Sequence, residues 1–205
     1  MMTFDLTPEQ QKLVAAATSV KALPAPAIDA VLVVEEIATR DPARGAKLGF
    51  EGVGGRSNTT AAMMPGLEGS EAALASIPEA NRIRARLIGA AVALGVGRAA
   101  IEHALEWMKT SGVKPNADET APHWAVADGA TEVAAARLLT YGAAQMLDRG
   151  ESAEDAITRA FTFAANAAER AVESAIRVVG ANGFARGGLL DRLSRDARTL
   201  QVILR

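Results

Sequence analysis

The helical pattern that runs from Pro78 almost to the end of this 205-residue chain constrains the fold most strongly. Apolar residues recur there at the spacing of one helix face, and turn residues break the pattern in only a few places. The breaks predict four helices, namely Ala80 to Thr110, Thr120 to Gly150, Ser152 to Val179 and Leu189 to Ile203. Three long helices and a shorter one, joined by short connections, are typical of an all-α four-helix bundle.

Local signals set the expected ends of these helices. Thr120 is a suitable cap with Pro122 just inside the helix, and Gly150 is a suitable terminator. The run Ser152-Ala-Glu-Asp155 predicts a capping box, with aspartate in place of the usual Glu or Gln. Gly180 is expected to stop the third helix.

Shorter helices are predicted before the bundle. Thr7-Pro8-Glu9 begins a helix that we expect to reach about Leu23, where Pro24-Ala-Pro26 breaks it. A second helix is expected from Ala27 to Thr39, and a third from Asp41 to about Gly49. We therefore divide the chain into an N-terminal helical segment (1–48), a Gly/Pro-rich linker (49–78), read as a long loop or a partly disordered stretch, and the bundle (79–205).

Composition excludes several classes of function. The chain is 49% apolar but only 4% aromatic, and its many alanines predict closely packed helices. A formal charge of −2 gives no attraction to nucleic acid. There is no cysteine, and the two histidines have no partners at metal-ligand spacing, so no metal site is predicted. The longest apolar stretch, Leu87 to Gly97, is too short to cross a membrane, and the start of the chain does not resemble a signal peptide. We expect a cytoplasmic protein.

Motifs near the end of the chain carry a family resemblance. The segments Ser174–Phe184 and Asp191–Arg198, the latter containing Arg195-Asp-Ala-Arg198, resemble the last part of acyl-CoA dehydrogenases. Further matches occur upstream in the family's order: Arg86–Ala91, Glu102–Lys109, Trp124–Asp128 and Ala134–Arg137. Residues 82–203 thus resemble the family's C-terminal four-helix domain. The pieces Phe4–Gln10 and Val33–Ala38 resemble its N-terminal helical domain, here in shortened form.

The resemblance also implies differences from a full-length enzyme. The family has a β-barrel domain between the two helical domains, which packs against the flavin and the acyl thioester. Only the linker 49–78 stands at that place. The family base is a carboxylate, because the reaction removes a proton next to the thioester. Its two family positions match Leu204 and Ala85, which cannot accept a proton, so no catalytic residue is assigned. We expect the chain to be inactive alone.

A flavin contact is the best candidate site. In the family, a glycine turn and a preceding glutamine contact a dinucleotide, FAD, that is bound mainly by a neighbouring subunit. The matching residues here are Arg177, Gly180, Ala181, Asn182, Gly183 and Phe184. Arginine at the glutamine position can pair with a pyrophosphate. The alternative is a helix C-cap followed by an Asn-Gly turn. The family's Arg-x-x-Phe-Gly motif, which grips the neighbouring flavin, is replaced by Lys109–Pro115. Arg86 matches an arginine near the family's active centre, or it bridges helices.

Three functions remain open. The first is the small subunit of a heteromeric, FAD-dependent acyl-CoA dehydrogenase of lipid metabolism, in which a full-length partner supplies the barrel, most of the flavin site and the base. The second is an inactive scaffold or regulator that forms homo-oligomers or caps a partner without flavin. The third is a homo-oligomer that binds another acyl or hydrophobic ligand along Ala85–Ala100. Acyl-CoA is an expected ligand under the first.

Overall fold

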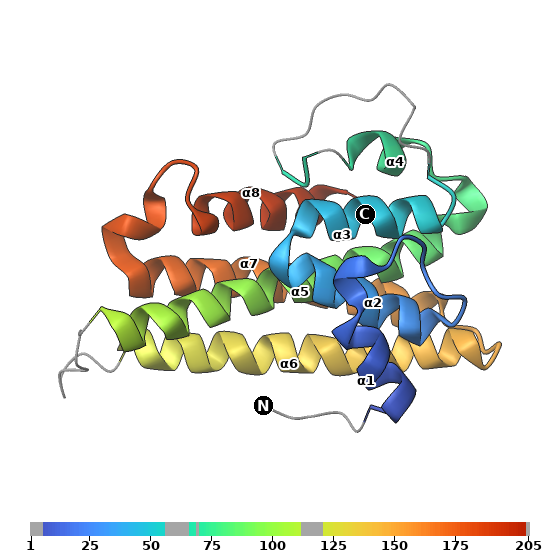
Figure 1. Cartoon of the computed structure of the whole chain (residues 1–205), viewed down its shortest axis with the longest axis horizontal. Coiled ribbons are helices and arrows are strands. Elements are labelled where there is room, and N and C mark those ends of the chain that lie inside the picture. Colours follow the sequence, from blue (N-terminus) through green and yellow to red (C-terminus); the bar gives the residue numbers. More distant parts are fainter. Residues whose placement is uncertain (1–5, 56–65, 69, 112–120, 204–205) are drawn as a thin grey trace.

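The computed structural model describes residues 6–55, 66–68, 70–111 and 121–203. Its regular elements within these residues are all helical, which confirms the predicted all-α class (Figure 1). The α-helices are α1 (Pro8–Ala15), α2 (Ala27–Arg40), α3 (Pro42–Gly52), α4 (Glu71–Ala75), α5 (Arg82–Thr110), α6 (Ala121–Asp148), α7 (Glu154–Val179) and α8 (Leu189–Val202). Short 3₁₀ turns precede or follow three of them: η1 (Ala17–Ser19), η2 (Glu79–Asn81) and η3 (Gly180–Phe184).

The bundle consists of α5, α6, α7 and α8, as the sequence predicts. Helices α5 and α7 run in the same direction, because Arg86 lies next to Thr158 and Gly97 lies next to Ala168. Helix α6 runs the opposite way between its neighbours, and α8 returns along α7 after the η3 connection (Figure 1). Helices α2 and α3 pack across α5 on the side away from the α5–α6 connection.

The first helix is shorter than predicted. Thr7 and Gln10 form the expected start, a reciprocal capping box, but α1 ends at Ala15 rather than near Leu23. The chain then turns as η1, where the Ser19 hydroxyl donates to the Ala16 carbonyl. Ala17 is fully buried against Val33 and Ile37 of α2. Packing against α2 thus overrides the local helical preference of this segment.

Helix α2 begins at Ala27 as predicted, although no residue next to it in sequence caps it. The carboxylate of Asp148, at the end of α6, accepts hydrogen bonds from the backbone N–H groups of Ala27 (2.6 Å) and Ile28 (3.0 Å). Those two groups have no partner within the helix itself. A carboxylate is also the favourable charge at a helix N-terminus. Asp148 therefore fixes α2 to the far end of the bundle.

The linker expectation for 49–78 requires correction. Helix α3 continues to Gly52, and α4 forms within the supposed loop. Leu67 is fully buried, with a positive φ of 53°, and its N–H donates to the buried carboxylate of Asp196 on α8 at 2.6 Å. The local sequence around Leu67 is typical of a turn, but burial of its side chain and this long-range hydrogen bond fix it against α8. Residues 56–65 and 69 lie outside the described part.

Two of the predicted helix ends are confirmed and one is wrong. Gly150 and Gly180 have positive φ, and Gly180 closes α7 by donating to the Ile176 carbonyl. The predicted Ser152 capping box is absent, because α7 begins one residue later with Ala153 at its cap position and no side-chain cap bond. Acidic residues in the first turn still favour that N-terminus through the helix dipole. The expected cap Thr120 lies outside the described residues.

Small residues allow the close packing that the composition predicts. A Cβ atom at Gly95 of α5 would lie 2.5 Å from the Cβ of Ala38 on α2, so only glycine permits this approach of the two helices. The side of α5 between Ala85 and Ala100 is buried by its neighbours, with most of its residues below 5% exposed. This stretch forms the bundle core, so it does not line a vacated ligand space as the third hypothesis required.

Burial in the bundle also explains why one helix of the described residues is unusually apolar. Residues Glu79–Thr110 are long and apolar enough to cross a membrane by length and composition. However, 83% of their most apolar window is buried inside the protein, where it packs as the core of the bundle.

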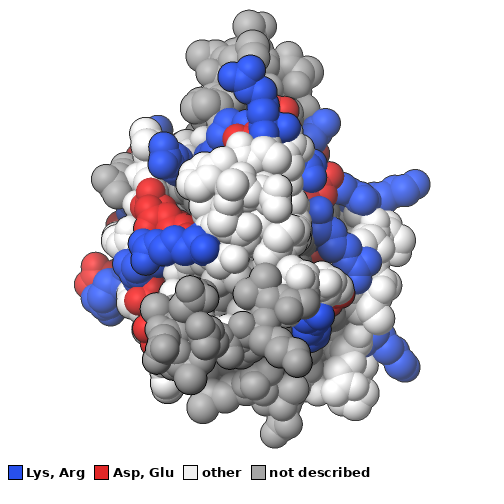
Figure 2. Space-filling model, turned by 90° about the vertical axis from the view of Figure 1, so that its left-hand side faces the viewer, with Lys and Arg blue, Asp and Glu red and all other residues white. Residues whose placement is uncertain are grey.

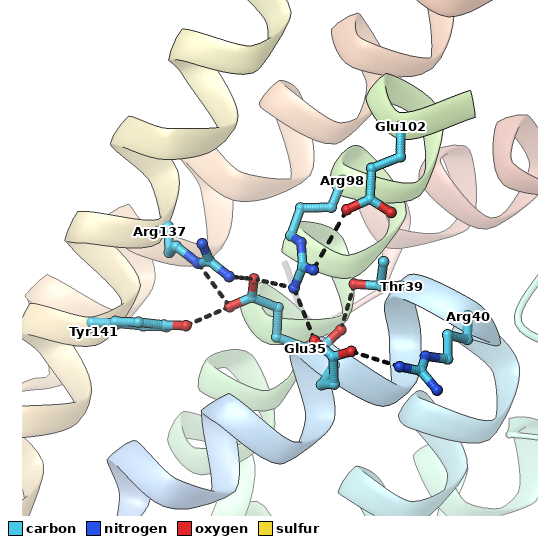
Figure 3. A network of polar contacts seen from close by, with 8 residues as sticks. Glu35, Thr39, Arg40, Arg98, Glu102, Arg137 and Tyr141 are labelled. Carbon is cyan, nitrogen blue, oxygen red and sulfur yellow. Dashed lines mark hydrogen bonds and ion pairs between the residues drawn. The ribbon is translucent and has the colours of Figure 1, made fainter. Parts of the chain in front are cut away.

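A buried ionic network joins α2, α5 and α6 (Figure 3). Glu35 of α2 is 1% exposed, and its carboxylate accepts hydrogen bonds from three side chains. Arg98 of α5 donates at 3.1 Å, the Tyr141 hydroxyl of α6 donates at 2.7 Å, and Arg137 of α6 donates through both Nε (3.2 Å) and Nη2. Arg98 also contacts Glu36 at 3.3 Å. The network therefore balances the charges that the three helices bury.

The protonation of this network is fixed by its geometry. Burial is the largest single influence and lowers the pKa of Arg98 and of Arg137, but the surrounding charges and hydrogen bonds, led by the Glu35 carboxylate, together raise both pKa values. Burial, followed by the Glu35 charge, raises the pKa of Tyr141 far above its ordinary range. Tyr141 thus remains a neutral donor and both arginines remain charged.

We expect Glu35→Ala to lower the free energy of unfolding by about 3–5 kcal/mol, because two largely buried guanidinium groups lose their counter-charge. Urea denaturation followed by far-UV circular dichroism measures the loss. The matched control is Glu102→Ala, which removes an exposed carboxylate 3.5 Å from the same Arg98 and should cost less than about 1 kcal/mol. Equal costs for the two variants would contradict the central role of Glu35.

Candidate functional site

A cavity of about 540 Å³ lies between α7, η3 and α8. It is lined by Glu169, Val172, Glu173, Ile176, Arg177, Gly183, Phe184, Asp191, Ser194, Arg195, Ala197 and Arg198. The end of the molecule that carries the η3 connection faces the viewer in Figure 2, where acidic and basic side chains border an uncharged area. The volume lies within the range of small-molecule sites in proteins.

The structure places the six predicted flavin-contact residues at one end of α7, but only part of the set lines the cavity. Arg177, Gly183 and Phe184 do, whereas Gly180, Ala181 and Asn182 do not. Gly180 is needed for its positive φ of 69°, which ends α7 and starts η3. Asn182 and Ala181 are exposed on the outer side of that turn.

Each cavity-lining residue of η3 has a distinct local role. Gly183 is buried, and a Cβ there would lie 3.3 Å from the backbone of Ile176, so this glycine lets η3 pack onto α7. The side chain of Phe184, in contrast, is 73% exposed. A large apolar ring that is mostly exposed beside the cavity can contact a ligand.

Three guanidinium groups converge on the cavity from two helices. Arg177 comes from α7, and Arg195 and Arg198 come from one face of α8, because residues three apart lie side by side on a helix. Arg195 donates to Asp191 at 2.7 Å, while Arg177 lies 3.7 Å from Glu173. Among the described residues, no carboxylate forms an ion pair with Arg198. The three-residue spacing of Arg195 and Arg198 is the sequence signal that could have indicated this shared face.

Asp191 is held at the start of α8. Its carboxylate accepts the backbone N–H of Gly187 at 2.9 Å as well as the Arg195 guanidinium. The Gly187 hydrogen bond, followed by Arg195, lowers the pKa of Asp191 below its ordinary value. An ionised carboxylate therefore occupies the N-terminus of α8, and the remaining positive charge of the cavity comes from arginine side chains.

The predicted substrate-pocket residue lies elsewhere. Arg86 of α5 donates to the Thr158 hydroxyl of α7 at 3.3 Å, which matches the helix-bridging alternative, and it does not line the cavity. Ala85, one of the two family base positions, is fully buried in α5. The other, Leu204, lies outside the described residues. No group of three or more potential metal ligands occurs in the part of the chain that the structure describes.

Comparisons with known proteins show the family. Residues 82–203 match the acyl-CoA dehydrogenase C-terminal domain. An acyl-CoA dehydrogenase of Bacillus subtilis (strain 168) is 34% identical over 165 residues, which are 76% of this chain and 42% of that protein. The caffeyl-CoA reductase–Etf complex subunit CarC of Acetobacterium woodii is 29% identical over 119 residues, which are 57% of this chain and 31% of CarC. The structure of PigA with FAD and proline superposes with a TM-score of 0.79 at 12% identity, through 99% of this chain and 95% of that one.

The chain therefore belongs to the acyl-CoA dehydrogenase family, and its bundle is the C-terminal domain of that family. It spans less than half the length of the curated relatives described above. The likeness to PigA, at low identity, shows the fold alone.

The Arg195-Asp-Ala-Arg198 motif also gives a prediction of pH dependence. Burial raises the pKa of the Asp196 carboxyl above its ordinary value, although the Leu67 N–H lowers it in part. The folded protein thus holds this proton more tightly than the unfolded chain, so ionisation of Asp196 costs stability as the pH rises through the interval between the two pKa values.

Asp196→Asn keeps an acceptor for Leu67 but carries no charge. We expect it to be more stable than the wild type at neutral pH, with an advantage that shrinks as the pH falls towards the ordinary aspartate pKa of about 4 and is lost below it. Thermal unfolding across this pH range tests the trend. Asp196→Ala, which leaves the buried Leu67 N–H without its acceptor, should instead lose about 1–3 kcal/mol. An Asn variant with a constant disadvantage at every pH would refute the assigned cost of the charge.

Proposed function

We propose that this chain is a subunit of a heteromeric, FAD-dependent acyl-CoA dehydrogenase. In this assembly, a full-length family member supplies the β-barrel, most of the flavin site and the catalytic base. The chain contributes its bundle surface and a contact to the dinucleotide at the α7–η3–α8 cavity. Its membership in the family and the similarity to CarC, a complex subunit by name, support an assembled role.

The observation that carries the proposal is the composition of the cavity. Arg177 takes the position of the family glutamine, and it shares the cavity with Gly183, Phe184 and two further arginines. A guanidinium group binds phosphate oxygens through two parallel, charge-assisted hydrogen bonds, so this set of donors fits the pyrophosphate of FAD. When bound, the flavin supplies hydride acceptance for the oxidation of an acyl thioester.

The roles assigned to the two subunits follow from the β-barrel and the catalytic base, which the partner would supply. No strand occurs in the described residues between α3 and α5, which supports a partner that supplies the barrel. The matched base positions hold Ala85 and Leu204, and a general base requires a group that accepts a proton. The partner's carboxylate would remove the substrate proton, while this chain helps to orient the cofactor.

The scaffold function is the second candidate, and one observation favours it. Glu169, Glu173 and Asp191 line the same cavity as the three arginines. If these carboxylates neutralise the arginines permanently, the cavity is a surface ion-pair cluster and the bundle serves only for association.

We expect co-expression with a full-length acyl-CoA dehydrogenase encoded nearby in the same genome to give a complex that co-elutes in size-exclusion chromatography with flavin absorbance. Arg177→Ala should lower the ratio of flavin to protein while the complex persists, because the variant removes a phosphate-binding charge from an exposed position. Arg192→Ala is the matched control, since this α8 arginine does not line the cavity and should leave the ratio unchanged.

A complex that forms without flavin, or a colourless homo-oligomer that ignores the full-length protein, would favour the scaffold instead.

A further inference from the structure

We infer that residues 66–68 and Ser70 form a latch on α8 that opens locally while the bundle stays folded, and that the charge of Asp196 sets how often it opens. We call this segment the Leu67 latch. It is independent of the proposed function, because neither the cofactor contact nor a partner subunit takes part in it.

Three hydrogen bonds and one buried side chain hold the latch closed. The Leu67 side chain is fully buried, and its backbone N–H donates to the Asp196 carboxylate of α8 at 2.6 Å. The Leu67 carbonyl accepts the backbone N–H of Ser70 at 3.0 Å and the Ser70 hydroxyl at 2.7 Å. The latch is therefore a compact turn that the Asp196 carboxylate fixes to α8.

The closed latch also contains three features that cost free energy. Leu67 has a φ of 53°, a left-handed conformation that is unfavourable for a residue with a side chain. Asp196 is only 8% exposed, so water hydrates its ionised carboxylate poorly. The buried hydroxyl of Thr199, one turn further along α8, has no hydrogen-bond partner among the described residues. Opening relieves all three, because it releases the Leu67 backbone and admits water to α8.

Gly66 allows the latch to lie directly on α8. A Cβ atom at this position would lie 2.4 Å from the Arg195 carbonyl oxygen and 2.6 Å from the Thr199 hydroxyl oxygen. The Gly66 backbone therefore covers these two groups. A side chain at residue 66 would keep the latch from closing.

The place of the latch in the fold makes its opening local. Helix α4, which follows the latch, contacts only α3 among the described elements (Figure 1). Helix α8, in contrast, packs on α5, α7 and η3 as well as on α3. Segments with few contacts open at a lower free energy than the whole protein unfolds. The latch can thus leave α8 while the bundle helices remain packed.

The surroundings of Asp196 determine how its charge acts on the latch. Charged side chains from the α2–α3 junction, the latch and α8 border a cavity of about 180 Å³ beside Asp196, namely Arg40, Asp41, Glu68, Arg192 and Arg195. In the described part of the chain, α5 and α7 contribute no residue to this lining. Burial is the largest influence on the Asp196 pKa and raises it, and Glu68 adds to the rise. The Leu67 N–H, Arg195 and Arg192 lower it in part.

The closed latch consequently binds the Asp196 proton more tightly than the open latch, in which the carboxyl is hydrated. The closed form is most stable below the ordinary aspartate pKa of about 4, where both forms are protonated. As the pH rises from there through the raised pKa, ionisation of Asp196 shifts the equilibrium towards the open latch. Above the raised pKa the effect is constant.

Amide hydrogen exchange of the full chain, followed residue by residue by NMR, tests the latch. After correction for the pH dependence of intrinsic exchange, the protection of the Leu67 amide should fall several-fold between about pH 4 and about pH 7. The amide of Ala168, in the middle of α7, should be much better protected at both values, because it exchanges only through larger openings. Equal protection of the two amides would overturn the inference, since the latch would then open only with the bundle.

Asp196→Asn tests the role of the charge. The variant keeps an acceptor for the Leu67 N–H, so the pH dependence of Leu67 protection should disappear, with protection at neutral pH no lower than in the wild type. Asp41→Asn is the matched control. It changes a carboxylate that borders the same cavity but accepts from the Arg44 N–H, and it should leave the pH dependence in place. A pH dependence that survives in Asp196→Asn would refute the role of this carboxylate.

Gly66→Ala opens the latch without a change of charge. Its Cβ meets the Arg195 carbonyl, so the protection of the Leu67 amide should fall about tenfold or more at every pH, while that of Ala168 is unchanged. Gly142→Ala is the control for this change, because a Cβ there meets no atom within 4 Å, and it should leave Leu67 protected. A Gly66→Ala variant that retains Leu67 protection, or that loses protection equally at Ala168, would contradict a local latch.

Discussion

The carboxylate of Glu35 is the interaction on which the arrangement of the N-terminal helices depends. It brings a negative charge from α2 into contact with guanidinium groups of α5 and α6, at a depth where neither sign is tolerated alone. The close contact of Gly95 with Ala38 brings α5 and α2 together. The ionic network fixes the register, because only one placement of α2 satisfies both arginines and Tyr141 (Figure 3).

Much of the fold could be predicted from local signals in the sequence. Helical spacing and turn residues located the bundle helices to within a few residues, because each of these helices is long and ends at a strong break such as Gly180. The errors arose where distant contacts decide the structure. Ala17 packs against α2 and ends α1 early, and Leu67 is held by Asp196 from the far end of the chain. No local pattern carries those contacts.

The candidate site shows the same division. The glycine turn and Arg177 were singled out from the sequence because they stand at a helix end within a family motif, and of these Arg177 and Gly183 line the cavity. The place of Arg195 and Arg198 in the cavity lining was not predicted, since it depends on how α8 returns along α7 and on which of its faces meets the cavity. Glu35 was overlooked for a similar reason. A glutamate within an amphipathic helix looks solvated until two arginines from other helices are placed beside it.

The cap that Asp148 provides for α2 links residues about 120 positions apart in the chain. Such a contact closes a very long loop, and the loss of chain entropy on closure opposes it until the rest of the fold holds the two ends together. The start of α2 can thus gain its cap only once α6 has formed and docked. The N-terminal helices are therefore expected to consolidate late in folding, on a bundle that is already assembled, although they leave the ribosome first.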